Sequence, residues 1–213
     1  MRLEGKVALI SGGARGMGVA EARLFAKEGA IGYVLEAQGK ELEAEINASG
    51  GGALFVRLDV TQADSWSWAI EATMSRFGKL DVLVNNAAIF ATIPMNRGGI
   101  ETIDLAEWDR LIAVNLKGPF LCARAVLPTM RARKSGKIIN IGSGTALVGP
   151  PGRIHYVASK DRGILEARIG LNIERWSLDL GQARSRIPGS QGITDPHMPA
   201  PVAVPTTFCS SQF

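Results

Sequence analysis

Residues 6–18 read KVALISGGARGMG, and this stretch decides the fold that the sequence predicts. The apolar run from Lys6 to Ser11 predicts a buried strand, and the glycines after it predict a tight turn. An amphipathic helix should follow, with an apolar side made of Val19, Ala22, Phe25 and Ala26. A strand, a glycine turn and a helix in this order can present backbone N–H groups to a pyrophosphate. Because the spacing differs from G-x-G-x-x-G, an ordinary glycine-rich turn remains an equal alternative.

Apolar periodicity along the rest of the chain predicts alternating strands and helices. The strands are expected at 30–35, 53–58, 80–84 and 137–141, and the helices at 38–48, 63–77, 104–133 and 155–180. This alternation over the first 180 residues predicts an α/β fold with a doubly wound, Rossmann-like parallel sheet and right-handed crossovers.

Polar residues follow several of the predicted strands, on the side where ligands bind in open α/β sheets. Glu36 could bind an adenosine ribose or cap the next helix, and Asp59 could hold an adenine amine or act as a cap. The small and amide side chains of Asn85 to Ala88 suit a crevice for a cofactor. Residues 89–103 are expected to form a substrate-side loop.

A second group of polar residues lies downstream and contains Ser143, Tyr156 and Lys160. A free tyrosine hydroxyl has a pKa of about 10, so it is a poor acid or base at neutral pH. On a helix, residues four apart have Cβ atoms about 5 to 6 Å apart, so the ammonium of Lys160 could stabilise a Tyr156 phenolate. Ser143 follows the apolar run 137–141 and could hydrogen-bond a carbonyl oxygen beside the phenol. The alternative is a core tyrosine, a solvated lysine and a turn serine.

Asn115 lies in the middle of an otherwise apolar predicted helix, where asparagine is disfavoured. It could kink the helix and reach a water molecule, or it could be bonded within the core.

The composition of the chain predicts a globular protein. Of its 213 residues, 46% are hydrophobic and 21% are charged, and the formal net charge is +4. The basic residues are mixed with acidic ones, so no nucleic-acid partner is expected. Two cysteines and two histidines without motif spacing make a disulfide framework or a zinc site improbable, and no metal is expected. With a charged start and no apolar stretch near the roughly 20 residues that span a bilayer, we expect no membrane partner and a cytoplasmic location.

Together these motifs resemble the short-chain dehydrogenase/reductase family. The matching segments are 11–18, 59–60, 85–88, Asn115, Ser143 and 156–160. The resemblance implies an NAD- or NADP-dependent oxidoreductase that interconverts a secondary alcohol and a ketone. Tyr156 would donate the proton in reduction and accept it in oxidation, and Lys160 would favour the phenolate and bind the nicotinamide ribose. Ser143 would hold the carbonyl oxygen, and Asn115 would position a water in a proton relay.

The resemblance also implies a set of cofactor-binding residues. Gly12, Gly16 and Gly18 would carry the pyrophosphate with Arg15 and Met17 beside it, Asp59 and Val60 would meet adenine, and Asn86, Ala87 and Ala88 would line the adenosine side. Glu36 is the candidate for the adenosine ribose, and Thr194 for the nicotinamide carboxamide. In this family the two long helices commonly pack against their copies, which implies a homodimer or homotetramer.

The end of the chain departs from the family pattern. Residues 182–213 hold five of the ten prolines and are expected to form an irregular tail after a catalytic domain at 1–181. The chain from Arg186 runs directly into Pro188, which leaves no room for a sixth strand. We therefore expect a sheet shortened at its C-terminal edge. A second hypothesis follows, in which the chain is a catalytically impaired remnant that binds the cofactor.

Overall fold

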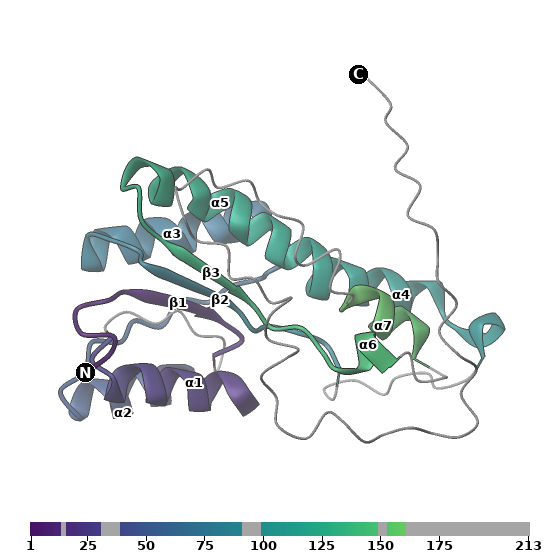
Figure 1. The fold of residues 1–213 in the computed structure, drawn as a ribbon, viewed down its shortest axis with the longest axis horizontal. Coiled ribbons are helices and arrows are strands. Elements are labelled where there is room, and N and C mark those ends of the chain that lie inside the picture. The colour runs from purple at the N-terminus through teal and green to yellow at the C-terminus, as the bar shows by residue number, and fades with distance from the viewer. Residues whose placement is uncertain (14–15, 31–38, 91–98, 149–152, 161–213) are drawn as a thin grey trace, which may run out of the picture. The chain divides into compact units, whose positions relative to one another are not determined.

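A three-stranded parallel sheet forms the centre of the part of the chain that the computed structural model describes. That part covers residues 1–13, 16–30, 39–90, 99–148 and 153–160, all within one compact unit, Met1–Ile173. The strands are β1 (Ala8–Ser11), β2 (Val82–Asn85) and β3 (Lys137–Asn140), in the order β1-β2-β3 (Figure 1). Several predictions lie outside the described residues: most of the strand at 30–35, Arg15, Glu36, Thr194, the helix beyond 160, the shortened sheet edge and the domain boundary at 181.

Helices cover both faces of this sheet, as the doubly wound prediction requires. Figure 1 shows α1 (Gly16–Lys27) and α2 (Gly39–Ala48) below the strands, with α3 (Ala63–Phe77) and α5 (Gly118–Ala132) above them. The side chains of β1 alternate between the two layers, because successive residues of a strand point to opposite faces. Ala8 and Ile10 pack in the α1 and α2 layer, whereas Leu9 packs in the α3 and α5 layer. The α/β prediction is confirmed.

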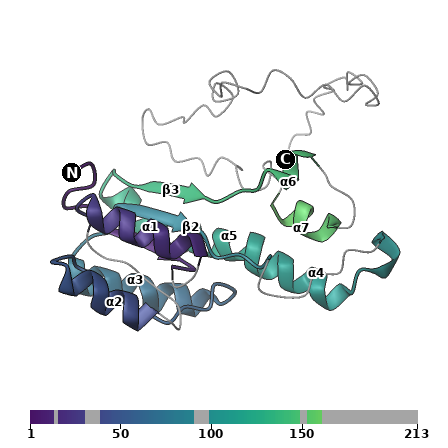
Figure 2. The ribbon, with the colours of Figure 1, turned by 90° about the horizontal axis from the view of Figure 1, so that it is seen from below.

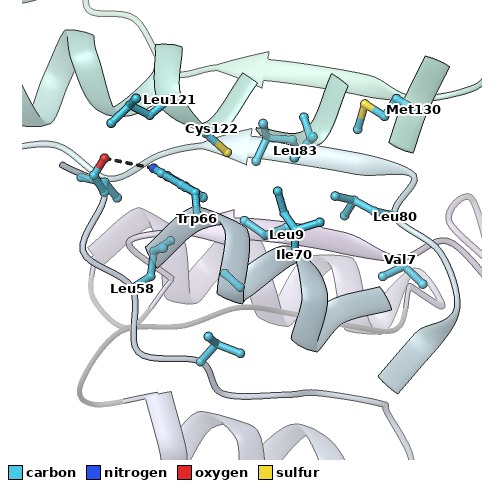
Figure 3. Packing of buried hydrophobic residues seen from close by; sticks show 14 residues of the cluster. Val7, Leu9, Leu58, Trp66, Ile70, Leu80, Leu83, Leu121, Cys122 and Met130 are labelled. Carbon is cyan, nitrogen blue, oxygen red and sulfur yellow. Dashed lines mark hydrogen bonds between the residues drawn. The ribbon is translucent and has the colours of Figure 1, made fainter. Parts of the chain in front are cut away.

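The larger core lies between the sheet, α3 and α5, and Figure 3 shows its packing. Trp66 of α3 is fully buried, and its indole Nε1 donates to the carbonyl oxygen of Val60 at 3.0 Å. An indole buried without such a partner would lose the hydrogen bond that it makes in water. This bond fixes the chain just before α3 against the α5 side of the sheet. Other members of this core are Val7, Leu9, Leu58, Ile70, Leu80, Leu83, Leu121, Cys122, Val126 and Met130.

One helical run crosses the molecule from α4 (Leu105–Ile112) through a π-helical turn (Ala113–Lys117) into α5. Asp104 begins it by accepting a hydrogen bond from the Ala106 N–H at 3.0 Å, as the sequence predicts. Within the described residues this run, Leu105–Ala132, is the one helix long and apolar enough to cross a membrane by length and composition. The prediction that no stretch approaches that length is therefore wrong. The α5 part packs one face into the larger core, as a core helix does.

Two short helices and a single-turn 3-10 helix complete the described structure. They are α6 (Thr145–Val148), α7 (Ile154–Ser159) and η1 (Ile100–Thr102). Figure 1 and Figure 2 both place α4, α6 and α7 beyond the end to which β3 points. In an open parallel sheet this is the end where ligands bind.

The predicted strand at 53–58 is wrong for the described structure, because these residues do not join the sheet. Their backbone groups are bound instead by side chains of α2. Asn47 accepts from the Ala53 N–H at 2.7 Å and donates to the Ala53 carbonyl at 3.3 Å, and Glu43 accepts from the Phe55 N–H at 3.0 Å. The apolar alternation that suggested a strand is used in packing, since Ala53, Val56 and Leu58 are buried.

Hydrogen bonds of Asp81 connect the N-terminal ends of β1, β2 and β3. Its carboxylate accepts from the Val7 N–H at 2.9 Å and from Arg133 at 3.0 Å, and its backbone carbonyl accepts from the Lys137 N–H at 2.9 Å. Burial alone would raise the pKa of this carboxyl, but the Val7 N–H, Arg133 and Lys79 outweigh it, so the pKa is lowered. The ionised form therefore stabilises the fold.

We predict that Asp81→Asn lowers the free energy of unfolding by about 1 to 3 kcal/mol at pH 7, because it weakens bonds to buried donors. The lowered pKa means that this stabilisation is present above the ordinary value of 3.8 and is lost as the pH falls through the folded value. Urea unfolding should show that the difference in unfolding free energy between Asp81→Asn and the unaltered protein is smaller near pH 3 than at pH 7. Asp109→Asn, on the exposed side of α4, is the control, and equal stability of Asp81→Asn and the unaltered protein at pH 7 would contradict the prediction.

Candidate active site

The glycine turn after β1 is held against the end of β2. The Asn86 side-chain amide donates to the carbonyl oxygens of Ser11 and Gly12, both at 3.1 Å. The Ser11 hydroxyl in turn accepts from the Ala87 N–H at 3.1 Å. Gly12 has φ +68°, and a Cβ there would lie 2.8 Å from the Ala87 Cα. Only glycine fits this backbone conformation and this close approach.

The next two glycines meet different constraints. A Cβ at Gly18 would lie 2.8 Å from both the Gly13 Cα and the Asn86 Nδ2, so this glycine packs α1 tightly against the turn. Gly16, with φ +53°, has no atom of the described residues beyond its chain neighbours and its own helix within 4 Å of its Cβ position. The first turn of α1 therefore opens to space, and the neighbouring Met17 is 63% exposed. A helix N-terminus with this open approach fits a pyrophosphate, since N–H groups there lack helical partners.

Asp59 and Val60 lie between the 53–58 segment and α3. The Asp59 carboxylate accepts from the N–H and the hydroxyl of Thr61, at 2.9 and 2.7 Å. The N-cap of α3 is Gln62, so the alternative in which Asp59 caps that helix is wrong. Val60 is buried and contacts the position where a Gly118 Cβ would stand. Asn86, Ala87 and Ala88 are half-buried beyond β2.

Tyr156 lies on α7 in a small apolar cluster with Ile89 and Leu111. It is 7% exposed, and its ring centroid lies 4.5 Å from that of Phe90. The aromatic ring is thus held between the end of the β2 extension and α4, with its orientation set by packing.

Lys160 ends α7 and is only 4% exposed. Its backbone N–H donates to the Tyr156 carbonyl at 3.1 Å, which continues the helical turn, and its Nζ donates to the Ile141 carbonyl at 2.9 Å. Burial lowers the pKa of Lys160 to about 8. The alternative of a solvated surface lysine is therefore wrong, and the ammonium lies beside the end of β3.

Ser143 lies two residues beyond Ile141, at the start of α6. Its Oγ is 2.7 Å from the Thr145 Oγ1 and accepts from the Thr145 N–H at 3.3 Å. Since α6 contacts α7, these bonds hold Ser143 near the helix that carries Tyr156. The Lys160 bond to Ile141 ties the same two parts of the chain together.

Asn115 is fully buried in the π-helical turn. Its Oδ1 accepts from the Ile89 N–H at 2.8 Å, and its Nδ2 donates to the Ile89 carbonyl at 3.1 Å and to the Ser159 Oγ at 3.0 Å. The side chain is therefore bonded within the core, which was one of the two alternatives. The helix also departs from α geometry here, since the Gly118 N–H reaches back to the Ala113 carbonyl.

The structure gives roles to residues that the sequence analysis missed. Ser11, Ile89 and Ser159 hold predicted site residues, and Glu107 is bonded to His155 beside Tyr156. The position of Ser159 three residues after Tyr156 was a possible signal for its role. No pattern in the sequence pairs Glu107 with His155, because 48 residues separate them.

The parallel sheet, the glycine turn and the Tyr156 and Lys160 helix define a Rossmann-like α/β protein. The chain belongs to the short chain dehydrogenase family, whose sequence pattern matches residues 6–164. All described residues of the predicted site fall within this match.

Individual relatives agree with the family assignment. The chain is 48% identical over 168 residues to a trans-4-hydroxycyclohexanecarboxylate dehydrogenase from Sinomonas cyclohexanicum, covering 75% of this chain and 62% of that one. It is 45% identical to a 3-alpha-(or 20-beta)-hydroxysteroid dehydrogenase from Mycobacterium tuberculosis, covering 75% and 59%. The match to a cyclopentanol dehydrogenase from Comamonas testosteroni is 41% identical and covers 75% and 63%. The chain thus spans less than two thirds of the length of these relatives.

A solved structure gives the same fold. A metagenomic short-chain oxidoreductase in complex with NADP superposes with a TM-score of 0.67 at 39% identity, covering 75% of this chain and 72% of that one.

We predict that the buried Lys160 makes stability depend on pH in the alkaline range. Its pKa is about 8 in the folded protein against an ordinary 10.5, so the unfolded chain binds more protons between these values. The unfolding free energy of the unaltered protein, relative to Lys160→Met, should rise from pH 8 to pH 10.5 by up to about 3 kcal/mol.

Urea unfolding of both proteins at pH 7.5, 9 and 10 measures this difference. Lys40→Met, which removes an exposed lysine of α2, is the control. A difference that stays constant from pH 7.5 to 10 would show that Lys160 is not desolvated.

Proposed function

We propose that this protein is an NAD- or NADP-dependent oxidoreductase that interconverts a secondary alcohol and a ketone. The observation that carries the proposal is the burial of the Lys160 ammonium one helical turn from Tyr156. Desolvating an ammonium is unfavourable, and in the described residues no carboxylate is paired with it. A phenolate and ribose hydroxyls are partners that would compensate this cost.

The described residues fit a dinucleotide. The open first turn of α1 at Gly16 and Met17 would hold the pyrophosphate, and the closely packed Gly12 and Gly18 would keep that turn in place. Arg15 is proposed to flank the pyrophosphate, Asp59 and Val60 to meet adenine, and Asn86, Ala87 and Ala88 to line the adenosine side. Glu36 for the ribose and Thr194 for the carboxamide remain proposals. The bound nicotinamide supplies or accepts the hydride.

In the proposed reduction, Tyr156 gives its phenolic proton to the carbonyl oxygen as the carbonyl carbon gains a hydride. In oxidation the phenolate removes the proton from the alcohol. The Lys160 ammonium stabilises the phenolate by Coulomb attraction. Ser143 orients the substrate oxygen, and when the Thr145 hydroxyl donates to Ser143, the Ser143 proton is free for that oxygen.

Asn115 is proposed to support a proton relay. Its side-chain amide is already bonded to Ile89 and Ser159, so we propose that a water would bind its backbone carbonyl instead. A π-helical turn changes the usual i to i+4 pairing, which is how such turns free carbonyl groups at functional sites.

The names of the relatives support a class of substrates to assay first. The hydroxyls of 4-hydroxycyclohexanecarboxylate and cyclopentanol and the 3-alpha-hydroxyl of a steroid are secondary alcohols on rings, whereas a 20-beta-hydroxyl is a secondary alcohol on the steroid side chain. We therefore propose an alicyclic secondary alcohol as the substrate.

We also propose a homo-oligomer formed through the long helical run. Phe120 on α5 is 61% exposed and Leu105 on α4 is 77% exposed, whereas Leu111 and Leu121 of the same two helices are buried. Large exposed apolar side chains along one helical run are typical of a subunit contact.

We predict that Tyr156→Phe lowers kcat by about 100- to 10,000-fold, the usual contribution of a general acid or base. Cofactor affinity should change by less than about threefold, because the packing of the ring is kept. Turnover of cyclohexanol and cyclopentanol with NAD and NADP, followed by absorbance, and fluorescence titration of NADH and NADPH measure the two effects. Trp68→Phe, an exposed aromatic on α3, is the control. Cofactor binding without any turnover in the unaltered protein would favour the impaired-remnant hypothesis instead.

We predict that the unaltered protein is a dimer or tetramer at micromolar concentration by light scattering. Phe120→Ser should shift it toward the monomer, because it removes an apolar contact between subunits. Trp68→Ser, an exposed apolar residue on another helix, should leave the mass unchanged. A stable monomer of the unaltered protein would refute the oligomer proposal.

A further inference from the structure

A regular stripe of residues from α4 and the π-helical turn contacts α7, the short helix that carries Tyr156. Glu107, Leu111 and Asn115 are spaced four residues apart, so they lie on one face of the helical run. Glu107 bonds to His155, Leu111 packs with Tyr156, and Asn115 bonds to Ser159. Tyr156 thus lies between two hydrogen-bonded pairs, Glu107 with His155 on one side and Asn115 with Ser159 on the other.

The contact at the start of α7 is a buried histidine and carboxylate pair. His155 is fully buried, and its Nε2 lies 2.8 Å from the Glu107 Oε1. A carboxylate oxygen accepts, so Nε2–H is the donor. The other ring nitrogen, Nδ1, is buried and has no hydrogen-bond partner among the described residues. The Glu107 contact is therefore the one described polar bond that orients this ring.

The start of α7 has another side-chain contact, a cation–π contact of Arg153 with the Phe90 ring at 5.2 Å, which is a weak interaction at an exposed site. α7 has only six residues, and its N-cap, Arg153, makes no side-chain capping bond. A helix this short is not stable alone and takes its orientation from tertiary contacts. In the described residues the side-chain hydrogen bonds from α7 to the long helical run are the Glu107 and His155 pair at its start and the Asn115 and Ser159 pair at its end.

We propose that Glu107 and His155 are positioning residues that set the place of the Tyr156 hydroxyl by fixing the first turn of α7 to α4. The catalytic consequence rests on the proposed oxidoreductase function. Loss of the pair frees the N-terminal end of α7 while the Asn115 contact still holds the other end, so the helix tilts and the phenol moves. A misplacement of about 1 Å can cost about 100-fold in rate. The glycine turn is on a different part of the sheet, and Lys160 lies at the end of α7 that Asn115 still holds, so cofactor affinity should change much less than kcat.

Two variants of Glu107 separate positioning from general stability. Glu107→Ala removes the acceptor for His155, and Glu107→Gln keeps a carbonyl oxygen of the same reach. Asp109→Ala, on the exposed side of the same helix, is the matched control. Val126→Ala, in the core on α5, lowers stability without touching α7.

The first readout is turnover. Glu107→Ala should lower kcat by about 10- to 100-fold with a much smaller change in cofactor affinity, and Glu107→Gln should restore kcat to within about threefold. Asp109→Ala and Val126→Ala should keep kcat when assayed well below their unfolding temperatures. The proposal is overturned if Glu107→Ala keeps kcat, or if Glu107→Gln is no better than Glu107→Ala.

The second readout needs no turnover. The chain has two tyrosines, so ring-labelled tyrosine gives two sets of NMR signals, and Tyr156→Phe assigns them. The Phe90 ring at 4.5 Å displaces the Tyr156 signals, which makes them a measure of its position. Glu107→Ala should move these signals toward unstructured values, while Glu107→Gln and Val126→Ala should not.

Turnover and the Tyr156 NMR signals together distinguish a failure of the oxidoreductase proposal from a failure of the positioning proposal. If the unaltered protein has no turnover with any alicyclic alcohol or ketone, the oxidoreductase proposal fails. The ring signals then still decide the positioning: a Tyr156 signal unmoved by Glu107→Ala overturns it, and a moved one supports it.

Discussion

The buried side-chain amide of Asn115 is the interaction on which the proposed catalytic half of the site depends. Its three hydrogen bonds join the extension of β2 at Ile89, the middle of the long helical run and the helix that carries Tyr156. Each of these bonds gives a partner to a buried polar group. Leaving such a group without a partner costs more free energy than a hydrogen bond contributes net to stability. The π-helical turn is the local consequence, because it sets a polar residue of an otherwise apolar helix into the core without ending the helix.

A second constraint acts on Lys160 and opposes stability. Burial lowers its pKa from 10.5 to about 8, which corresponds to about 3 kcal/mol of unfavourable free energy when the amine is charged. The bond to the Ile141 carbonyl offsets part of this cost and points the ammonium to the end of β3. Natural proteins keep such unfavourable groups mainly where function requires them. The glycine turn is a similar case, since Gly12 and Gly16 adopt conformations that other residues rarely adopt.

Much of the fold could be predicted because the spacing of apolar residues along the sequence distinguishes helices from strands. The helix at 63–77 has the predicted bounds, and the predicted strands at 80–84 and 137–141 contain or overlap β2 and β3. The strand predicted at 53–58 is wrong because alternating apolar residues do not show whether a neighbouring strand is present to pair with them. In the structure, side chains of α2 bind the backbone of this segment instead. The Tyr156 and Lys160 spacing predicted a shared helical turn correctly. It could not show that Lys160 would be buried, because that depends on Ile141 and the end of another strand. The pairing of Glu107 with His155 depends in the same way on how α4 and α7 pack.

The two halves of the site therefore differ in how they are encoded. The proposed pyrophosphate site is built by one segment, from β1 through the glycine turn into α1, with Asn86 as its main long-range contact. The catalytic half is assembled from the β2 extension, the long helical run, the end of β3 and α7, which meet only in the folded chain. Substitutions in the first half act through local backbone conformation and steric fit. In the second half they act through the relative placement of elements, which is why we propose that Glu107 sets the position of the Tyr156 hydroxyl through the packing of α4 and α7.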